Sequence, residues 1–121
     1  MNDIIMALGS NQNQVENINS AKVALQKHFT SARFTASIWS EPVGMESTER
    51  FLNCLCRVTS EDDIDCINGF LKRTEKEIGR TSDNSKQGKI AIDIDILKFN
   101  DAIMHESDWK RGYIKELIKH I

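Results

Sequence analysis

The order of hydrophobic and polar residues along the chain predicts strands in four places. Each segment is short, rich in aliphatic or aromatic residues, and bounded by residues that favour turns, as strands in a sheet usually are. In the third segment Leu52, Cys54, Cys56 and Val58 share one face, so we expect that face to pack on the core. The expected strands are residues 3–8, 33–39, 51–59 and 90–99.

Apolar residues recur every three or four positions in two longer segments, which predicts two amphipathic helices. The first has Ile18, Ala21 and Leu25 on its apolar side. The second follows three consecutive acids, which are favourable at a helix N-terminus, and ends at a glycine. The expected helices are residues 14–29, residues 64–78 and a short one after Gly112, and the polar segments 40–50 and 80–89 are expected to be loops.

The resulting order of elements, strand-helix-strand-strand-helix-strand with a helical tail, predicts the fold class. Two strand-helix-strand units, with both helices on one side of a four-stranded antiparallel sheet, form a ferredoxin-like α+β fold. At 121 residues the chain is long enough for one such domain, residues 1–121. The other face of the sheet is then left free, and we expect a functional site there. Because many functions share this fold, the residues on that face must decide the function.

Two acidic residues interrupt the hydrophobic pattern of the fourth strand. Asp93 and Asp95 are two positions apart, so both carboxylates leave the same face, with their Cβ atoms about 7 Å apart. Aspartate is rare in strands, and like charges on one face repel each other. Mg²⁺ would relieve that repulsion, since it prefers carboxylate oxygens together with substrate phosphates. From the pattern alone, a solvent-exposed sheet face with two acids explains the residues equally well.

Composition and charge narrow the classes of function. The net charge of −2 gives no general attraction to nucleic acid or to an anionic membrane. No apolar run approaches the roughly 18 residues of a membrane span, and the N-terminus lacks the pattern of a signal peptide. The three cysteines are an odd number without metal-site spacing, which favours free thiols in a reducing compartment. We therefore expect a cytoplasmic protein.

Short motifs distributed along nearly the whole chain carry a more specific signal. Together they resemble the 6-hydroxymethyl-7,8-dihydropterin pyrophosphokinase family of folate biosynthesis, in the same order and with compatible spacing. That family also has a ferredoxin-like fold, which agrees with the order of elements above. The motifs are Ala7-Leu8-Gly9-Ser10-Asn11, Trp39-Ser40-Glu41-Pro42, Phe51-Leu52-Asn53, Glu75 through Ile78-Gly79-Arg80, Ile92-Asp93-Ile94-Asp95-Ile96-Leu97 and Arg111-Gly112-Tyr113.

The resemblance implies transfer of diphosphate from ATP to a pterin alcohol, with AMP as the leaving group and two Mg²⁺ ions as cofactors. It implies that Asp93 and Asp95 bind the metal and that both, with Arg80, serve catalysis. The pterin contacts that it implies are Glu41, Pro42, Gly44, Phe51, Asn53 and Tyr113. The ATP contacts that we expect on the same basis are Lys72, Glu75, Arg80, Lys86, Lys89, Ile96, His105 and Arg111.

The chain departs from the family pattern just before the fourth strand. Where family members typically have Trp-Gly-Pro-Arg-Thr, this sequence has Gln87-Gly88-Lys89-Ile90-Ala91, and Ser82 takes the place of a second loop arginine. Lys86 and Lys89 offer positive charge there, but lysine lacks the bidentate fork of arginine. Three hypotheses stay open: an active pyrophosphokinase, a pterin- or nucleotide-binding module without competent transfer, and an interaction protein. A homodimer through a sheet edge or face also stays open.

Overall fold

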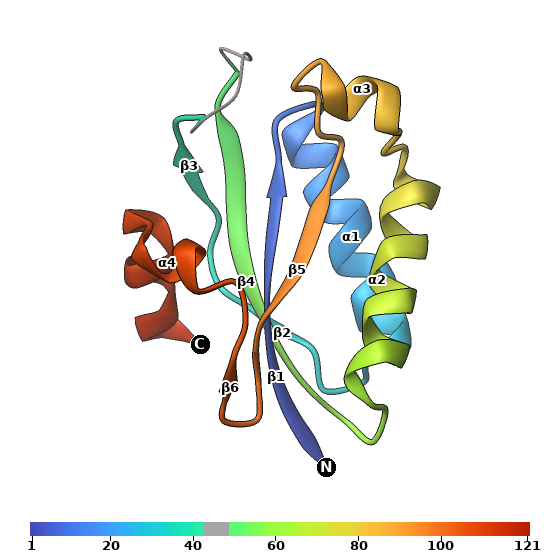
Figure 1. Cartoon of the computed structure of the whole chain (residues 1–121), viewed down its shortest axis with the longest axis vertical. Helices are drawn as coiled ribbons and strands as arrows, with labels where there is room; N and C mark the ends of the chain where they lie inside the picture. Colours follow the sequence, from blue (N-terminus) through green and yellow to red (C-terminus); the bar gives the residue numbers. More distant parts are fainter. Residues whose placement is uncertain (43–48) are drawn as a thin grey trace.

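The centre of the molecule is an antiparallel sheet (Figure 1). The computed structural model describes residues 1–42 and 49–121. Strand β1 lies in the middle, between β4 and β5; β2 and β3 pair with β4, and β6 pairs with β5. All of these pairs are antiparallel, which confirms the expected α+β fold class. The strands are β1 (Asn2–Ser10), β2 (Arg33–Phe34), β3 (Ile38–Ser40), β4 (Phe51–Ser60), β5 (Asp93–Phe99) and β6 (Ala102–Ile103).

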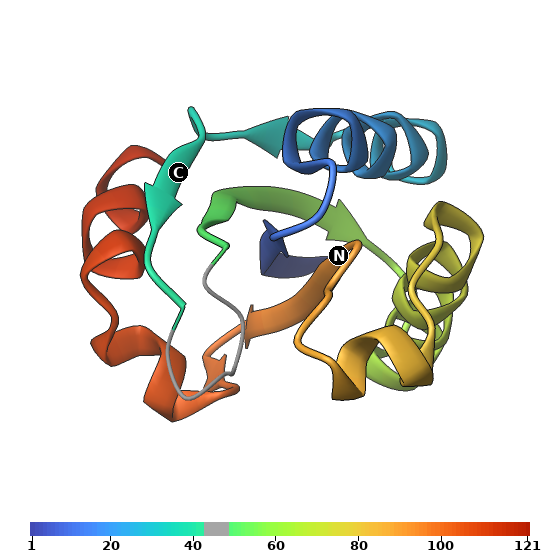
Figure 2. The same ribbon diagram turned by 90° about the horizontal axis from the view of Figure 1, so that it is seen from above.

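Two helices cover one face of this sheet, as the sequence predicts (Figure 2). Helix α1 (Gln14–His28) and helix α2 (Ile64–Ile78) contact each other, and the main core lies between them and the strands. The side chain of Asp63 caps α2 by accepting a hydrogen bond from the backbone N–H of Cys66 at 2.8 Å. The predicted apolar faces are buried here, including Ile18, Ala21, Leu25, Leu52, Cys54, Cys56 and Val58. None of the helices in residues 1–42 and 49–121 is long and apolar enough to cross a membrane.

A further helix covers part of the opposite face, so the prediction of a free face is wrong. Helix α4 (Gly112–Leu117) follows the 3₁₀ helix η1 (Glu106–Lys110) and packs against β3 and β4. Its buried residues join a second apolar cluster with three strand residues. Those strand residues neighbour main-core residues in sequence, so both faces of the central strands are apolar and both need cover. The cluster is Ile5, Leu55, Leu97, Ile114 and Leu117.

The second predicted strand is interrupted and forms β2 and β3 instead. Between these two strands, the Thr35 hydroxyl accepts a hydrogen bond from the backbone N–H of Leu55 at 2.9 Å. The backbone N–H of Thr35 donates to the Leu55 carbonyl at 3.0 Å. A side chain thus replaces one bond of the backbone ladder, and the strand breaks at that point.

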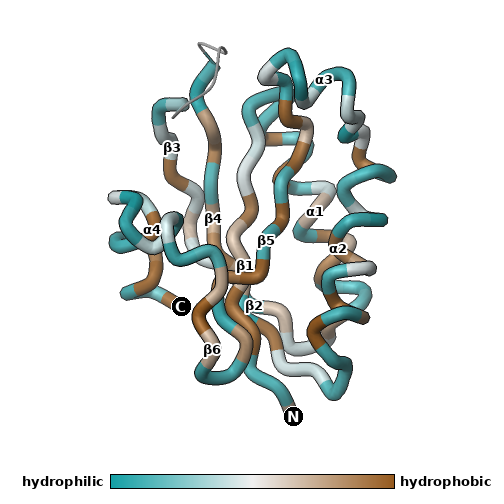
Figure 3. Tube along the Cα trace, in the orientation of Figure 1, coloured by the Kyte–Doolittle hydropathy of each residue, from teal (hydrophilic) through white to brown (hydrophobic). Residues whose placement is uncertain are grey.

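The polar segment before β5 is more ordered than the predicted loop. It contains the short helix α3 (Ser82–Lys86), which begins where the Thr81 hydroxyl accepts a hydrogen bond from the backbone N–H of Asn84 at 3.1 Å. Figure 3 shows that α3 is hydrophilic, whereas hydrophobic segments concentrate on the central strands. Local hydropathy therefore gave no sign of this helix, because it has no buried face.

Strand β5 begins at Asp93, three residues later than predicted. The reason is a contact between distant residues. The backbone N–H of Ile90 donates to Oδ1 of Asn11 at 2.6 Å, and the Ile90 carbonyl accepts from the backbone N–H of Asn11 at 3.1 Å. Asn11 also donates to the Gly88 carbonyl at 2.7 Å. The segment before β5 is therefore held by the loop after β1, beside the end of the sheet.

Candidate active site

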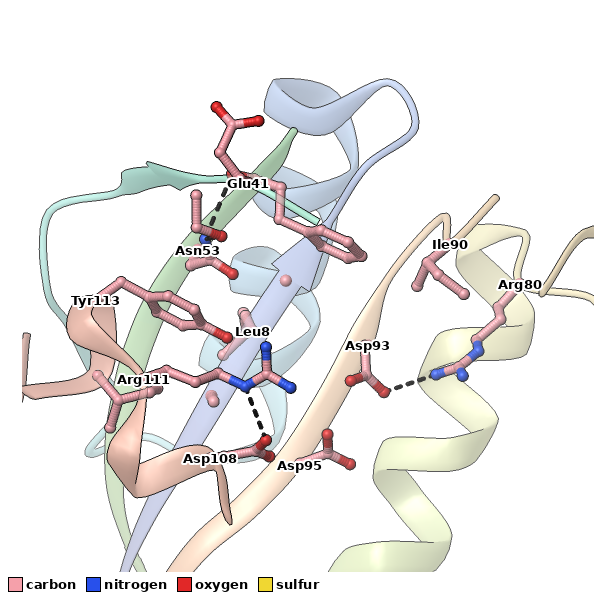
Figure 4. Close-up of a pocket in the computed structure, with 15 residues that line it drawn as sticks. Leu8, Glu41, Asn53, Arg80, Ile90, Asp93, Asp95, Asp108, Arg111 and Tyr113 are labelled. Carbon is pink, nitrogen blue, oxygen red and sulfur yellow. Dashed lines mark hydrogen bonds and ion pairs between the residues drawn. The ribbon is translucent and has the colours of Figure 1, made fainter. Parts of the chain in front are cut away.

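A cavity of about 240 Å³ lies at one end of the second sheet face. Its lining comes from β1, β4 and β5, from the residues that follow β3 and α2, and from the start of α4 (Figure 4). It brings together many of the residues that the sequence predicts for the site: Glu41, Phe51, Asn53, Arg80, Asp93, Asp95, Arg111 and Tyr113.

Asp93 and Asp95 enter this cavity from the same face of β5, as strand alternation predicts (Figure 4). Their partners across the ladder are the small residues Gly9 and Ala7 of β1. Burial and the neighbouring carboxyl of Asp93 raise the pKa of Asp95 to about 7. Burial opposes ionisation of Asp93 too, but its hydrogen bonds with Asp95 and Arg80 hold its pKa below the usual value. Asp95 therefore loses its proton at a higher pH than Asp93 does.

Basic side chains approach the aspartate pair from α2, from the segment after it and from the segment before η1. The Arg80 guanidinium lies 2.7 Å from Oδ1 of Asp93. Nζ of Lys72 lies 3.5 Å from Oδ1 of Asp95, and Nε2 of His105 lies 3.9 Å from the same oxygen. Basic side chains thus lie close to both carboxyls, an arrangement that suits an anionic substrate.

Glu75 is buried at the centre of this charged region, with only 3% of its surface exposed. Its Oε2 accepts hydrogen bonds from the backbone N–H of Ile94 at 2.7 Å and from Nζ of Lys72 at 3.0 Å. Its Oε1 lies 3.3 Å from the Arg80 guanidinium. A carboxylate with both oxygens engaged in this way ties α2, β5 and two basic side chains together. The expectation that Glu75 contacts ATP stays a prediction.

Asn53 and Phe51 line the cavity from β4. The Asn53 amide N–H groups donate to the Ser40 hydroxyl at 2.8 Å and to the Ile38 carbonyl at 3.1 Å, which fixes the side chain to β3. No described residue donates to Oδ1 of Asn53. A Cβ on Gly9 would lie 3.2 Å from that oxygen and 3.6 Å from the Phe51 ring. The absence of a side chain at Gly9 therefore leaves space for Oδ1 of Asn53 and for the Phe51 ring. An acceptor and an aromatic ring therefore adjoin at this side of the cavity.

Arg111 and Tyr113 close the cavity from the start of α4 (Figure 4). Nε of Arg111 donates to Oδ1 of Asp108 in η1 at 3.1 Å, which orients the guanidinium beside the aspartate pair. Burial raises the pKa of the Tyr113 hydroxyl, so Tyr113 stays neutral at physiological pH. The sequence reasoning missed Asp108, although its spacing of three residues from Arg111 in a helical segment is the signal that would have found it.

Other predicted site residues lie outside the cavity lining. Lys86 lines a neighbouring groove with Lys72, Lys76 and Ser82, and Arg80 belongs to both spaces. The remaining residues lie elsewhere: Pro42, Lys89, Ile96 and His105 do not line either space, and Gly44 lies outside the described residues. In Figure 4 the Glu41 carboxylate points away from the two aspartates, although Glu41 itself lines the cavity.

The aspartate pair fits a magnesium site that a substrate completes. Within residues 1–42 and 49–121, no three His, Cys, Asp or Glu side chains gather into a site made by protein alone. Mg²⁺ is commonly held by one or two carboxylates, with substrate phosphates and waters as its other ligands. The neighbouring carboxyl of Asp93 raises the pKa of Asp95, and a divalent cation has the charge to relieve the repulsion between the two groups.

Comparison with known proteins identifies the family of the chain. Relatives named folate synthesis bifunctional protein are 31% identical over 123 residues in Arabidopsis thaliana and, for a mitochondrial form, 29% over 122 residues in Pisum sativum. The folic acid synthesis protein FOL1 of Dictyostelium discoideum is 26% identical over 122 residues. Each alignment covers 93% of this chain, which spans only 25%, 24% and 18% of the respective relatives. A family model described as 7,8-dihydro-6-hydroxymethylpterin-pyrophosphokinase (HPPK) matches residues 5–121, and the chain therefore belongs to the HPPK family.

Proposed function

We propose that the chain transfers diphosphate from ATP to 6-hydroxymethyl-7,8-dihydropterin in folate biosynthesis, giving AMP and the pterin diphosphate. One observation carries the proposal. A single cavity joins the aromatic and amide groups of Phe51 and Asn53 to the carboxylates of Asp93 and Asp95. A flat heterocycle bound by Phe51 and Asn53 would present its substituent to a metal-bound polyphosphate at the two aspartates. Family membership supports the same reaction.

The pterin ring is proposed to lie between Phe51 and Tyr113. Aromatic side chains favour stacking with a flat ring, and both line the cavity. Oδ1 of Asn53 would accept a hydrogen bond from an N–H on the ring edge. Glu41 and Pro42, which follow β3, would shape the rim of this pocket.

The phosphates of ATP are proposed to lie along the basic side of the aspartate pair. Arg80 and Lys72 already contact the aspartates there, and Arg111 lies on the other side of the cavity. His105 would add positive charge when protonated. Lys86 and Lys89, from the segment before β5, would add charge at longer range.

The adenine is proposed to bind the open edge of β5 at Ile96. The N–H and C=O of Ile94 point away from β1, since they bond to Glu75 and Lys72 of α2. Backbone groups alternate in direction along a strand, so those of Ile96 face the same edge. Edge groups of this kind bind a heterocycle that has adjacent donors and acceptors.

The proposed reaction is an in-line displacement at the β-phosphorus of ATP. The hydroxymethyl oxygen of the pterin forms the new bond and releases its proton to solvent, the bond from the β-phosphorus to the α-phosphate oxygen breaks, and AMP leaves. Asp93 and Asp95 would hold Mg²⁺, which when bound neutralises phosphate charge and fixes the phosphate geometry. Arg80, Lys72 and Arg111 would stabilise the negative charge that the leaving group develops. The other contribution of the protein is to align the two substrates.

A second candidate function is binding of pterin or nucleotide without efficient transfer. The observation that favours it is Ile90, which lines the cavity with an apolar side chain where the resemblance predicts an arginine. Loss of one transition-state contact typically costs about 10²–10³ in rate. The described cations at the aspartate pair, Lys72 and Arg80, would compensate part of that loss.

Turnover and binding assays together separate the two functions. With Mg²⁺, ATP and the hydroxymethylpterin, we expect AMP to form, and we expect Asp95→Ala to abolish its formation. Asp101→Ala, which removes an exposed acid in the turn after β5, is the matched control and should leave turnover unchanged. Pterin binding without turnover would support the binding module. Absence of both would contradict both proposals.

We further propose that residues 1–121 act as one domain in the cytoplasm. Cys54 and Cys56 are buried free cysteines, and burial raises the pKa of their thiols to about 11 and about 12. Thiols of that kind persist in a reducing compartment.

The outer edge of β2 and β3 offers backbone groups for pairing with a second copy of the chain. Sedimentation at micromolar concentration would test for such a homodimer.

A further inference from the structure

Five charged side chains form a ring along the edge of β5. Arg80 bridges Asp93 and Glu75, at 2.7 and 3.3 Å. Lys72 bridges Glu75 and Asp95, at 3.0 and 3.5 Å. The ring closes where the two aspartates adjoin on the strand face. Positive and negative groups alternate around it except at that junction, which is where we expect a metal ion.

Glu75 is the fixed member of this ring. It is buried, and Oε2 is pinned to the backbone N–H of Ile94 at 2.7 Å. The side chains of Lys72 and Arg80 are 49% and 28% exposed, so they have room to turn while Glu75 stays in place.

We propose that Lys72 and Arg80 are resident counter-cations of the aspartate pair, positioned by Glu75, which a divalent cation must displace from the aspartates. Each lies at contact distance from an aspartate oxygen that the metal needs. The metal alone therefore binds against competition. A metal that arrives with a polyphosphate meets less competition, because the phosphates give both displaced cations a new partner.

This inference deepens the proposed function and rests on it for the identity of the metal and the nucleotide. It also makes metal and nucleotide bind cooperatively. Binding of one favours the other by the same factor, since such coupling is reciprocal. The assignment of Glu75 is that of a positioning residue, acting through the two cations that it holds.

The test measures binding of Mg²⁺ alone to the nucleotide-free protein by titration calorimetry. Lys72→Met should tighten Mg²⁺ binding by about fivefold, because one competing charge at about 4 Å is removed. The same variant should weaken binding of a non-hydrolysable ATP analogue in the presence of Mg²⁺ by a similar factor. These opposite signs separate displacement from general damage. Because Lys72 is half exposed, the variant is expected to fold.

Two further variants serve as controls. Lys76→Met removes the same charge from the same helix, and among the described residues Lys76 forms no ion pair with either aspartate, so Mg²⁺ affinity should change by less than about twofold. Lys72→Arg keeps the charge and should restore wild-type behaviour.

Glu75→Gln tests the positioning role of Glu75. It should weaken Mg²⁺ binding, because Lys72 and Arg80 then turn fully to the aspartates, whereas a merely structural Glu75 would alter stability alone.

Several results would overturn the inference. They are an unchanged or weaker Mg²⁺ affinity in Lys72→Met, an equal change in Lys76→Met, and no Mg²⁺ binding to any of these proteins. No pterin and no turnover enter the measurement. The inference can therefore fail while the proposed transfer stands, and the transfer can fail while the opposite signs are observed.

Discussion

Replacement of Asp95 by asparagine should stabilise the folded protein at pH 8, although it removes a proposed metal ligand. Burial and the neighbouring Asp93 raise the pKa of Asp95 from 3.8 to about 7. Between these values the folded state binds a proton that the unfolded chain does not, so stability falls as the pH rises and the full penalty remains above pH 7. At about 1.4 kcal/mol for each pKa unit, the penalty is at most about 4 kcal/mol. The Asp95 side chain is 20% exposed, and screening by water reduces the expected gain to about 1–3 kcal/mol.

Urea unfolding of the wild type and of Asp95→Asn, at pH 4 and pH 8 without Mg²⁺, measures this gain. We expect a higher midpoint for the variant at pH 8 and no gain at pH 4, where Asp95 is protonated in the folded protein. Asp93→Asn is the matched control. It loses the 2.7 Å contact with Arg80, and the pKa of Asp93 is lowered, so it should not stabilise. A lower midpoint for Asp95→Asn at pH 8, or an equal gain at both pH values, would refute the reasoning.

Three other changes test the remaining parts of the structure. Gly9→Ala should weaken pterin binding about fivefold, measured by fluorescence titration, because its Cβ would lie 3.2 Å from Oδ1 of Asn53; unchanged affinity would contradict the placement of the ring. Ile114→Ala should lower the free energy of unfolding by about 2–5 kcal/mol, since Ile114 is 1% exposed in the second apolar cluster; a loss below 1 kcal/mol would show that α4 is not needed for the fold. Asp3→Asn should cost at most about 1 kcal/mol above pH 4 and progressively less as the pH falls, because the Arg57 ion pair lowers the pKa of Asp3 and its contribution is lost when the carboxyl is protonated; a loss in chemical unfolding that does not shrink as the pH falls would contradict this.

The sequence pattern was sufficient for the central strands β1, β4 and β5, for α1 and α2, and for the shared face of Asp93 and Asp95. These features depend on local periodicity, which the chain displays clearly. The pattern predicted four strands, however, and missed both the break between β2 and β3 and the short strand β6. The late start of β5 could not be predicted in this way. It depends on hydrogen bonds between Asn11 and Ile90, which are far apart in sequence.

The covering of the second sheet face by α4 could not be predicted from the alternation of residues alone. Alternation assigned Leu52, Cys54, Cys56 and Val58 to the core, and it left Leu55 on what was predicted to be the free face. Leu55 is fully buried under α4. A large aliphatic residue on both sides of a central strand is the signal that both faces are covered, although it does not say by which segment.

The site was predicted in its acidic residues and only partly in their surroundings. Asp93 and Asp95 are conspicuous, because aspartate is rare in a strand. The charge of Glu75 suggests a surface position, although Glu75 lies four positions after the buried Leu71 and therefore on the same side of α2. Its burial follows from the edge of β5, whose Ile94 N–H needs an acceptor. Such pairing depends on the packing of helix against strand and is not visible in either segment alone.

The central claim is that the protein transfers diphosphate from ATP to a pterin alcohol in this cavity. Phosphorus NMR of a reaction with purified protein, Mg²⁺, ATP and 6-hydroxymethyl-7,8-dihydropterin tests it most directly. We predict equal amounts of AMP and of the pterin diphosphate, formed by wild type and not by Asp95→Ala. Formation of ADP with a pterin monophosphate, or an unchanged ATP spectrum, would contradict the claim.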